Sequence, residues 1–181
     1  MVAITVEKPN KGAGTIGLTV LQVAKIYGAR CIIVDLDTAR LERAVKFGAD
    51  ETIHSTPGAV KKAVAQENDG LEPTLVIDAA GVLELMQETL SIISPAGRIG
   101  LLGFLTQPTE IIQKDVVSKE ISIHGSRLSR GYLPQVISWF EEEKLNPSNM
   151  ITQTFPAQDA QTAFDFINEY PSSAIKVQLE F

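Results

Sequence analysis

Three glycines near the start of the chain, in Gly12-Ala13-Gly14-Thr15-Ile16-Gly17, have the spacing G-x-G-x-x-G, and an apolar run ending in Asp35 follows them. In a dinucleotide fingerprint, the first glycine makes a tight turn and the second lets backbone N–H groups approach a pyrophosphate. The third lets the helix pack on the sheet, and the helix N-terminus then faces the phosphates. Asp35 lies 23 positions after Gly12, near the offset of the acid that accepts hydrogen bonds from the adenosine ribose. We therefore predict a dinucleotide site in which Asp35 repels a 2′-phosphate and favours NAD over NADP. A glycine turn in some other α/β domain is the alternative.

The composition predicts an ordinary globular chain of one domain, or of one domain with a smaller appendage. It has 181 residues, of which 44% are hydrophobic, and a net charge of −6, which argues against non-specific binding of nucleic acid. The single cysteine, Cys31, allows no disulfide within the chain. No stretch approaches the roughly 18 apolar residues of a membrane span, and no signal peptide is evident. These observations predict a cytoplasmic protein that interacts with neither nucleic acid nor a membrane.

Helical and strand patterns alternate after Gly12, which predicts an α/β fold with a doubly wound parallel sheet of the Rossmann type. After Gly125 the alternation stops, and the remaining pieces predict a C-terminal α/β appendage. Expected helices are 15–27, 38–47, 58–66, 82–93, 111–118, 132–143 and 158–168. Expected strands are 30–35, 51–54, 74–78, 98–102, 120–124 and 174–181.

The first eleven residues break the pattern. Val2–Val6 has the composition of a strand, but the polar and turn-forming residues 7–11, with Pro9 among them, separate it from Gly12. In a dinucleotide fold the first strand runs directly into the first glycine. The fingerprint is therefore regular on its helix side and irregular on its strand side.

From Gly12 onward the chain resembles the cofactor-binding half of the medium-chain, zinc-dependent alcohol and polyol dehydrogenases, and within them the sorbitol, threonine and sugar-acid types. The resemblance extends over about 170 residues and is carried by several motifs in order. These are residues 12–18 (GAGTIGL), 34–41 (VDLDTARL), 47–51 (FGADE), 76–81 (VIDAAG), 97–103 (GRIGLLG), 121–126 (ISIHGS) and 174–177 (AIKV).

The resemblance implies a cofactor role for individual positions. The glycine loop would include Gly12, Gly14, Thr15, Ile16 and Gly17, while Asp35 and Arg40 would hold the adenosine ribose. Ala79, Ala80 and Gly81 would line the cofactor channel, and Leu102, Gly103 and Phe104 would bracket the nicotinamide. Ile123, His124 and Gly125 would close the nicotinamide pocket, and Lys176 would approach the pyrophosphate. The resemblance also implies a homo-oligomer formed through the sheet edge near 98–104 and 120–125.

The family's chemistry needs a catalytic zinc, held by a separate domain, as a Lewis acid. The sequence offers only Cys31, within an apolar strand, and the distant His54 and His124. For each of the two histidines we expect a structural or surface role. We therefore expect no catalytic residue and no metal site in this chain, and the sequence leaves enzymatic activity open.

Residues 1–9 resemble the extreme N-terminus of the same family, the first strand of its catalytic domain. The corresponding hypothesis is that this opening joins the glycine loop directly, so that the catalytic domain and the first cofactor-domain strand are both missing. The expected division is a strand remnant over 1–11, a Rossmann domain over 12–125 and an appendage over 126–181. The appendage should then expose apolar surface around Leu133, Ile137 and Phe140.

Three functions remain open at this stage. The first is an NAD(H)-binding domain of an alcohol or polyol dehydrogenase, inactive alone. The second is a non-enzymatic dinucleotide-binding or interaction module. The third is an S-adenosylmethionine-binding domain, since those enzymes also use a glycine loop and an acid after the second strand.

Overall fold

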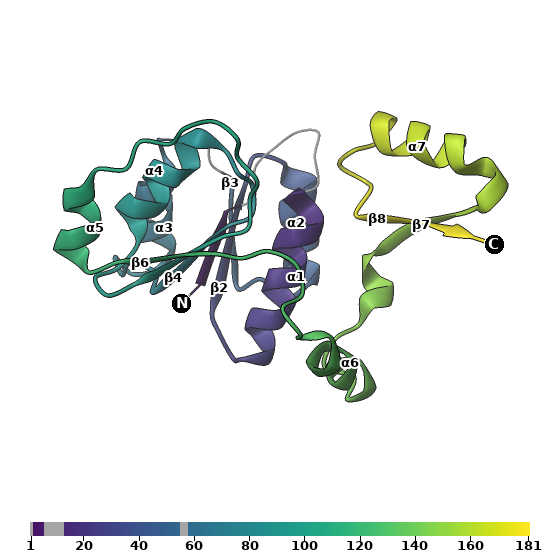
Figure 1. The fold of residues 1–181 in the computed structure, drawn as a ribbon, viewed down its shortest axis with the longest axis horizontal. Helices are drawn as coiled ribbons and strands as arrows, with labels where there is room; N and C mark the ends of the chain where they lie inside the picture. The colour runs from purple at the N-terminus through teal and green to yellow at the C-terminus, as the bar shows by residue number, and fades with distance from the viewer. Residues whose placement is uncertain (1, 6–12, 55–57) are drawn as a thin grey trace.

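The computed structural model describes residues 2–5, 13–54 and 58–181 (Figure 1). Six strands of these residues form one parallel sheet with the order β3-β2-β1-β4-β5-β6. Their bounds are β1 (Val2–Thr5), β2 (Cys31–Asp35), β3 (Glu51–His54), β4 (Leu75–Asp78), β5 (Arg98–Leu101) and β6 (Ser122–Gly125). This is the strand order of the doubly wound dinucleotide fold. The predicted fold class is confirmed.

Strand β1 fills the centre of the sheet. Its residues pair in parallel with β2, from Val2 opposite Cys31 to Thr5 opposite Val34, and with β4, from Val2 opposite Leu75 to Thr5 opposite Asp78. The chain therefore supplies a first strand at the topological switch point from its own opening residues, despite the irregular sequence that follows. The predicted turn and polar residues 6–12 lie outside the described part of the chain.

Helices cover both faces of the sheet (Figure 1). One face carries α1 (Ala13–Ile26) and α2 (Thr38–Lys46), and the other carries α3 (Val60–Glu67), α4 (Leu83–Ile92) and α5 (Gln113–Lys119). Alternate residues of β2 enter opposite cores: Ile32 and Val34 pack under α3 and α4, while Cys31 and Ile33 pack under α1 and α2. A parallel sheet covered on both faces needs such uninterrupted apolar strands, and this places Cys31 in the core as expected.

Strand β5 pairs with β4 on one side and with β6 on the other. Of the two stretches predicted to form the sheet edge, residues 98–101 therefore lie inside the sheet, and the prediction is wrong for them. Strand β6 is the edge. The error arose because the pattern of apolar residues does not reveal how many neighbours a strand has.

The C-terminal part is a second, smaller unit. Helix α6 (Leu133–Glu141) leads to strand β7 (Ile151–Pro156), helix α7 (Ala160–Glu169) and strand β8 (Lys176–Glu180). Strands β7 and β8 pair in parallel, so this unit is a βαβ crossover beside the main sheet. Strand β7 was not predicted. Within it only Thr152 and Phe155 are half-buried and the other residues are exposed, so the strand lacks the regular alternation of a half-buried strand.

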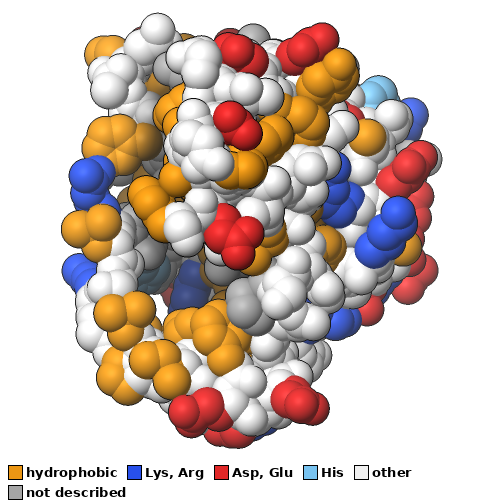
Figure 2. All heavy atoms as spheres, turned by 90° about the vertical axis from the view of Figure 1, so that its right-hand side faces the viewer, with side chains coloured by type: hydrophobic (Ala, Val, Ile, Leu, Met, Phe, Trp, Pro, Cys, Tyr) orange, Lys and Arg blue, Asp and Glu red, His pale blue; other side chains and the backbone are white. Residues whose placement is uncertain are grey.

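The expected apolar surface on this unit is present. Leu133, Ile137 and Phe140 of α6 are 62%, 53% and 40% exposed. On the face that carries α6 and α7, hydrophobic side chains gather at several places (Figure 2). Among the described residues, no helix is both long enough and apolar enough to cross a membrane.

Candidate functional site

The carboxyl ends of β1, β2 and β4 meet at one edge of the sheet, where ligands of doubly wound folds bind. Gly14, Thr15, Ile16 and Gly17 form the first turn of α1 at this edge, while Gly12 lies outside the described residues. The first N–H groups of a helix have no partner within it, and the helix dipole favours an anion there. The turn predicted to bind a pyrophosphate is thus placed at the expected edge.

Asp35 ends β2 and is 4% exposed. Its Oδ1 accepts a hydrogen bond from the backbone N–H of Asp37 at 2.9 Å. Burial raises the pKa of this carboxyl, although the Asp37 N–H and the nearby Arg40 partly oppose the shift. Asp35 lines one small pocket together with Gly14, Gly17 and Arg40. The glycine turn, the acid and the arginine predicted to share a site are therefore brought together.

A larger cavity of about 420 Å³ adjoins this pocket. One wall is built by Gly14 and Thr15 of α1 and by Arg40 and Arg43 of α2; the other is built by the C-terminal unit, with Ile167, Asn168, Pro171, Ala174, Ile175 and Val177. Arg40 lies 3.6 Å from the Asp37 carboxylate. The cavity therefore presents two guanidinium groups next to the first turn of α1, which suits an anionic ligand group.

Two glycine turns follow β4 and β5 on the other side of β1. Asp78, 5% exposed, ends β4, and its Oδ1 accepts hydrogen bonds from Ala80 N–H and Gly81 N–H, both at 2.9 Å. Its backbone carbonyl accepts from Leu102 N–H at 2.8 Å and Gly103 N–H at 2.9 Å. Asp78 therefore bonds both to the turn 79–81, predicted to line the cofactor channel, and to the turn 102–104, predicted to bracket the nicotinamide.

Asp78 is a site residue that the sequence reasoning missed. The signal was available, because Asp78 ends an apolar strand just as Asp35 does, and the side chains of both accept a backbone N–H two residues on. Side-chain bonds of this kind are typical of aspartate in turns.

The remaining predicted positions are Phe104, Ile123, His124 and Lys176, and none of them lines the two pockets around Gly14. Phe104 is 75% exposed, and the Arg127 guanidinium lies 4.7 Å from its ring centroid. Ile123 and His124 lie in β6 and Lys176 begins β8. His54 Nε2 lies 2.9 Å from the carbonyl oxygen of Leu36. His124 pairs across the sheet with Gly100, so the two histidines lie on different edges of the sheet and do not come together.

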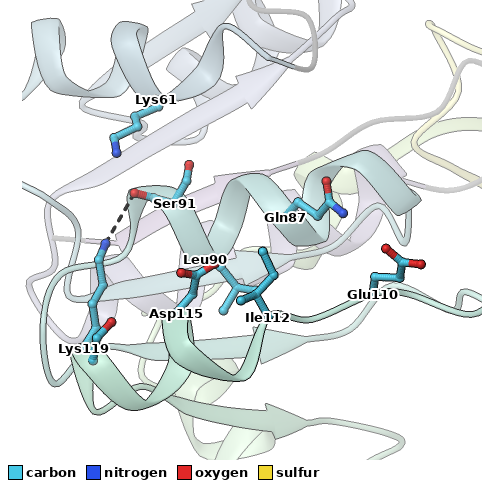
Figure 3. A pocket seen from close by; sticks show the side chains of 9 residues that line it. Lys61, Gln87, Leu90, Ser91, Glu110, Ile112, Asp115 and Lys119 are labelled. Carbon is cyan, nitrogen blue, oxygen red and sulfur yellow. Dashed lines mark hydrogen bonds between the residues drawn. The ribbon is translucent and has the colours of Figure 1, made fainter.

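Another cavity, of about 400 Å³, lies away from this edge (Figure 3). Lys61, Ser91 and Lys119 line it with six others, and none of the predicted cofactor residues is among them. Lys119 Nζ donates to the carbonyls of Ser91 and Ile93 at the end of α4. Cations near a helix C-terminus stabilise it, so Lys119 has a structural role there.

No three His, Cys, Asp or Glu side chains of the described residues come together in a way that could hold a metal ion. The donor set of this chain, as far as the structure describes it, therefore does not fit the catalytic zinc of zinc-dependent dehydrogenases. We assign no zinc-dependent step to these residues.

The sequence model of the zinc-binding dehydrogenases matches residues 15–142. The chain belongs to this family. Over 94% of its length it is 38% identical to the starvation-sensing protein RspB of Escherichia coli K12, and over 93% it is 31% identical to D-arabitol-phosphate dehydrogenase of Enterococcus avium. The first match covers 50% of the relative and the second 49%. The chain thus spans about half the length of the curated relatives it matches.

A solved structure of the short chain alcohol dehydrogenase RspB from Escherichia coli CFT073, complexed with NADH, superposes with a TM-score of 0.91. It is 36% identical, and the match covers 100% of this chain and 52% of that one. An apo zinc-dependent alcohol dehydrogenase from Streptococcus pneumoniae, 26% identical, superposes with a TM-score of 0.86. The chain therefore corresponds to the dinucleotide-binding half of these dehydrogenases.

Proposed function

We propose that the chain binds NAD(H) and acts as the cofactor half of an alcohol or polyol dehydrogenase. One observation carries the proposal: the buried Asp35 carboxylate ends the strand beside β1 and shares a pocket with Gly14 and Gly17. A carboxylate at this point accepts hydrogen bonds from the adenosine ribose. The NADH complex of RspB, a protein of the same fold, supports the assignment.

The residues divide along the cofactor. The first turn of α1 and Lys176 would bind the pyrophosphate, and Asp35 with Arg40 would bind the adenosine ribose. The turns 79–81 and 102–104, with Ile123 and His124, would hold the nicotinamide half. A bound nicotinamide would supply the hydride acceptor, and these residues would orient it.

NAD is proposed in preference to NADP because the carboxylate of Asp35 would repel a 2′-phosphate. The two neighbouring guanidinium groups also contact acceptors within the protein. Arg40 lies beside the Asp37 carboxylate, and Arg43 donates to the backbone carbonyl of Ser172 at 2.7 Å. Turnover of an alcohol would require zinc and acid–base groups that a further domain supplies.

A homo-oligomer formed through β6 (Ser122–Gly125) is also proposed, since this strand is paired only on its β5 side within the described sheet. An exposed strand edge is a ready template for a second chain. Light scattering coupled to size-exclusion chromatography would test this. A cytoplasmic location remains a prediction.

Titration of the purified chain with NADH and NADPH, followed by nicotinamide fluorescence, tests the cofactor proposal. We expect saturable binding of NADH and weaker binding of NADPH. Asp35→Asn should narrow this difference, whereas Asp115→Asn on α5, far from the site, should not. Binding of S-adenosylmethionine in place of either nucleotide would overturn the proposal. The chain can also be combined with the catalytic half of a relative. If NADH binds but no active dehydrogenase results, the non-enzymatic module is the better description.

A further inference from the structure

The segment from Pro171 to Ile175 connects the C-terminal unit to the adenosine end of the proposed site. The Ser172 hydroxyl donates a hydrogen bond to Oδ2 of Asp37, which lies 135 positions earlier in the chain. Arg43 Nη2 donates to the Ser172 carbonyl at 2.7 Å, and Thr15 Oγ1 donates to the Ile175 carbonyl at 2.7 Å. The segment is thus bound to the first turn of α1 and to α2.

Asp37, the partner of Ser172, is also the residue that orients Asp35. Its backbone N–H donates to Asp35 Oδ1 at 2.9 Å. Its side chain caps α2, because Oδ1 accepts from Ala39 N–H at 2.9 Å and from Arg40 N–H at 3.3 Å. The two functions of Asp37 are linked, since the side chain that Ser172 holds fixes the backbone whose N–H reaches Asp35.

The charge on Asp37 is stabilised at this junction. Burial alone would raise the pKa of Asp37, but the Ser172 hydroxyl and the two N–H groups of α2 outweigh it and lower the pKa. An ionised Asp37 accepts from Ser172 more strongly than a neutral one.

We propose that Ser172 is a positioning residue for cofactor selectivity, acting through Asp37 on the carboxylate of Asp35. The C-terminal unit would then be part of the device that distinguishes NAD from NADP, besides forming one wall of the cavity. This inference rests on the proposed NAD(H) function. Ser172 itself would not contact the ribose.

The test compares Ser172→Ala with Ser173→Ala, a matched control on the neighbouring exposed serine. Dissociation constants for NADH and NADPH give the selectivity ratio of each variant. Without the Ser172 hydroxyl we expect NADH to bind about three- to tenfold more weakly, as for the loss of one hydrogen bond that orients a charged group. Binding of NADPH should change little, because NADPH gains nothing from a well-oriented Asp35. The preference for NADH over NADPH should therefore fall. Ser172→Thr, which keeps a hydroxyl, should restore it.

A measurement without cofactor keeps the two proposals separate. Hydrogen exchange at the Asp37 amide, followed by NMR, should accelerate in Ser172→Ala and remain slow in Ser173→Ala. An unchanged ratio in Ser172→Ala, an equal loss of both cofactors, or an equal effect of the control would overturn the positioning role. If the parent chain binds neither nucleotide, the proposed function fails. Faster exchange in Ser172→Ala alone would still support the coupling of Ser172 to the Asp37 amide, and unchanged exchange would overturn it.

Discussion

Gly81 and Gly103 approach each other so closely that neither position has room for a side chain. A Cβ on Gly103 would lie 2.1 Å from the Gly81 nitrogen and 2.4 Å from its Cα. A Cβ on Gly81 would lie 2.7 Å from the Phe104 nitrogen, and Gly81 has a φ of +65°. Because the obstructing atoms belong to the backbone, they cannot move aside as a flexible side chain could. The two turns that Asp78 holds are therefore packed backbone to backbone.

Gly103→Ala should consequently destabilise the fold by about 3 kcal/mol or more, at the upper end of overpacking effects. Denaturant unfolding of the purified variant would measure this loss. Gly125→Ala is the control, because no atom lies within 4 Å of the Cβ position at Gly125. Equal stability of the two variants would show that the turns can separate at little cost.

Gly14→Ala should separate folding from cofactor binding. No atom lies within 4 Å of a Cβ at Gly14, and the residue lies in the first turn of α1, so the substitution should not lower the free energy of unfolding. The added methyl group would occupy the space through which a pyrophosphate approaches the backbone. We expect NADH binding to weaken at least tenfold while the thermal midpoint is unchanged or rises. Unaltered NADH affinity would place the pyrophosphate elsewhere.

The sequence predicted the main sheet well because its strands are covered on both faces. Such strands are continuous apolar runs, as in Cys31–Val34 and Leu75–Ile77, and each is followed by a helix with its own periodicity. The acid at the end of β2 was found for the same reason, since it interrupts an apolar run at a fixed distance from the glycines.

The sequence could not predict contacts between distant segments. The bond between Ser172 and Asp37 joins residues 135 positions apart, and no local pattern marks either as the partner of the other. Strand β7 was missed because its faces alternate only weakly between exposed and half-buried. The central place of β1 was equally hidden, because strand order depends on how helices cross over the sheet.

Asp35, which ends β2, and Asp50, whose carboxylate accepts from the Cys31 N–H at the start of β2, should respond oppositely to neutralisation. Burial raises the pKa of Asp35, so the fold disfavours its ionised form. The free energy of unfolding should therefore fall as the pH rises from the usual aspartate pKa through the raised pKa of Asp35 in the fold. Burial alone would raise the pKa of Asp50, but the hydrogen bonds from Lys25 and from the Cys31 N–H outweigh it and lower the pKa. The stability that Asp50 contributes is present above the usual aspartate pKa and is lost as the pH falls below it.

At pH 7, Asp35→Asn should therefore leave the fold equally stable or stabilise it by about 1 kcal/mol, whereas Asp50→Asn should destabilise it by about 0.5–1 kcal/mol. Urea unfolding at pH 7 and pH 4 would measure both. The difference between Asp50→Asn and the parent chain should shrink at the lower pH. Destabilisation by Asp35→Asn at neutral pH would show that its ionised form is better compensated than its burial indicates.

The apolar stripe on α6 should promote self-association of the isolated chain. Trp139 packs edge to face against Tyr27 of the preceding unit, with ring centroids 6.0 Å apart, and this contact fixes which side of α6 faces α1. Leu133, Ile137 and Phe140 follow at spacings of four and three residues, so they share one helix face, and all three are at least 40% exposed.

Ile137→Glu should reduce concentration-dependent light scattering and the fluorescence of a hydrophobic dye such as ANS. Gln135→Glu, an exposed position on the same helix, adds the same charge without removing apolar surface. If both variants reduce scattering and dye fluorescence equally, net charge rather than the apolar stripe governs association.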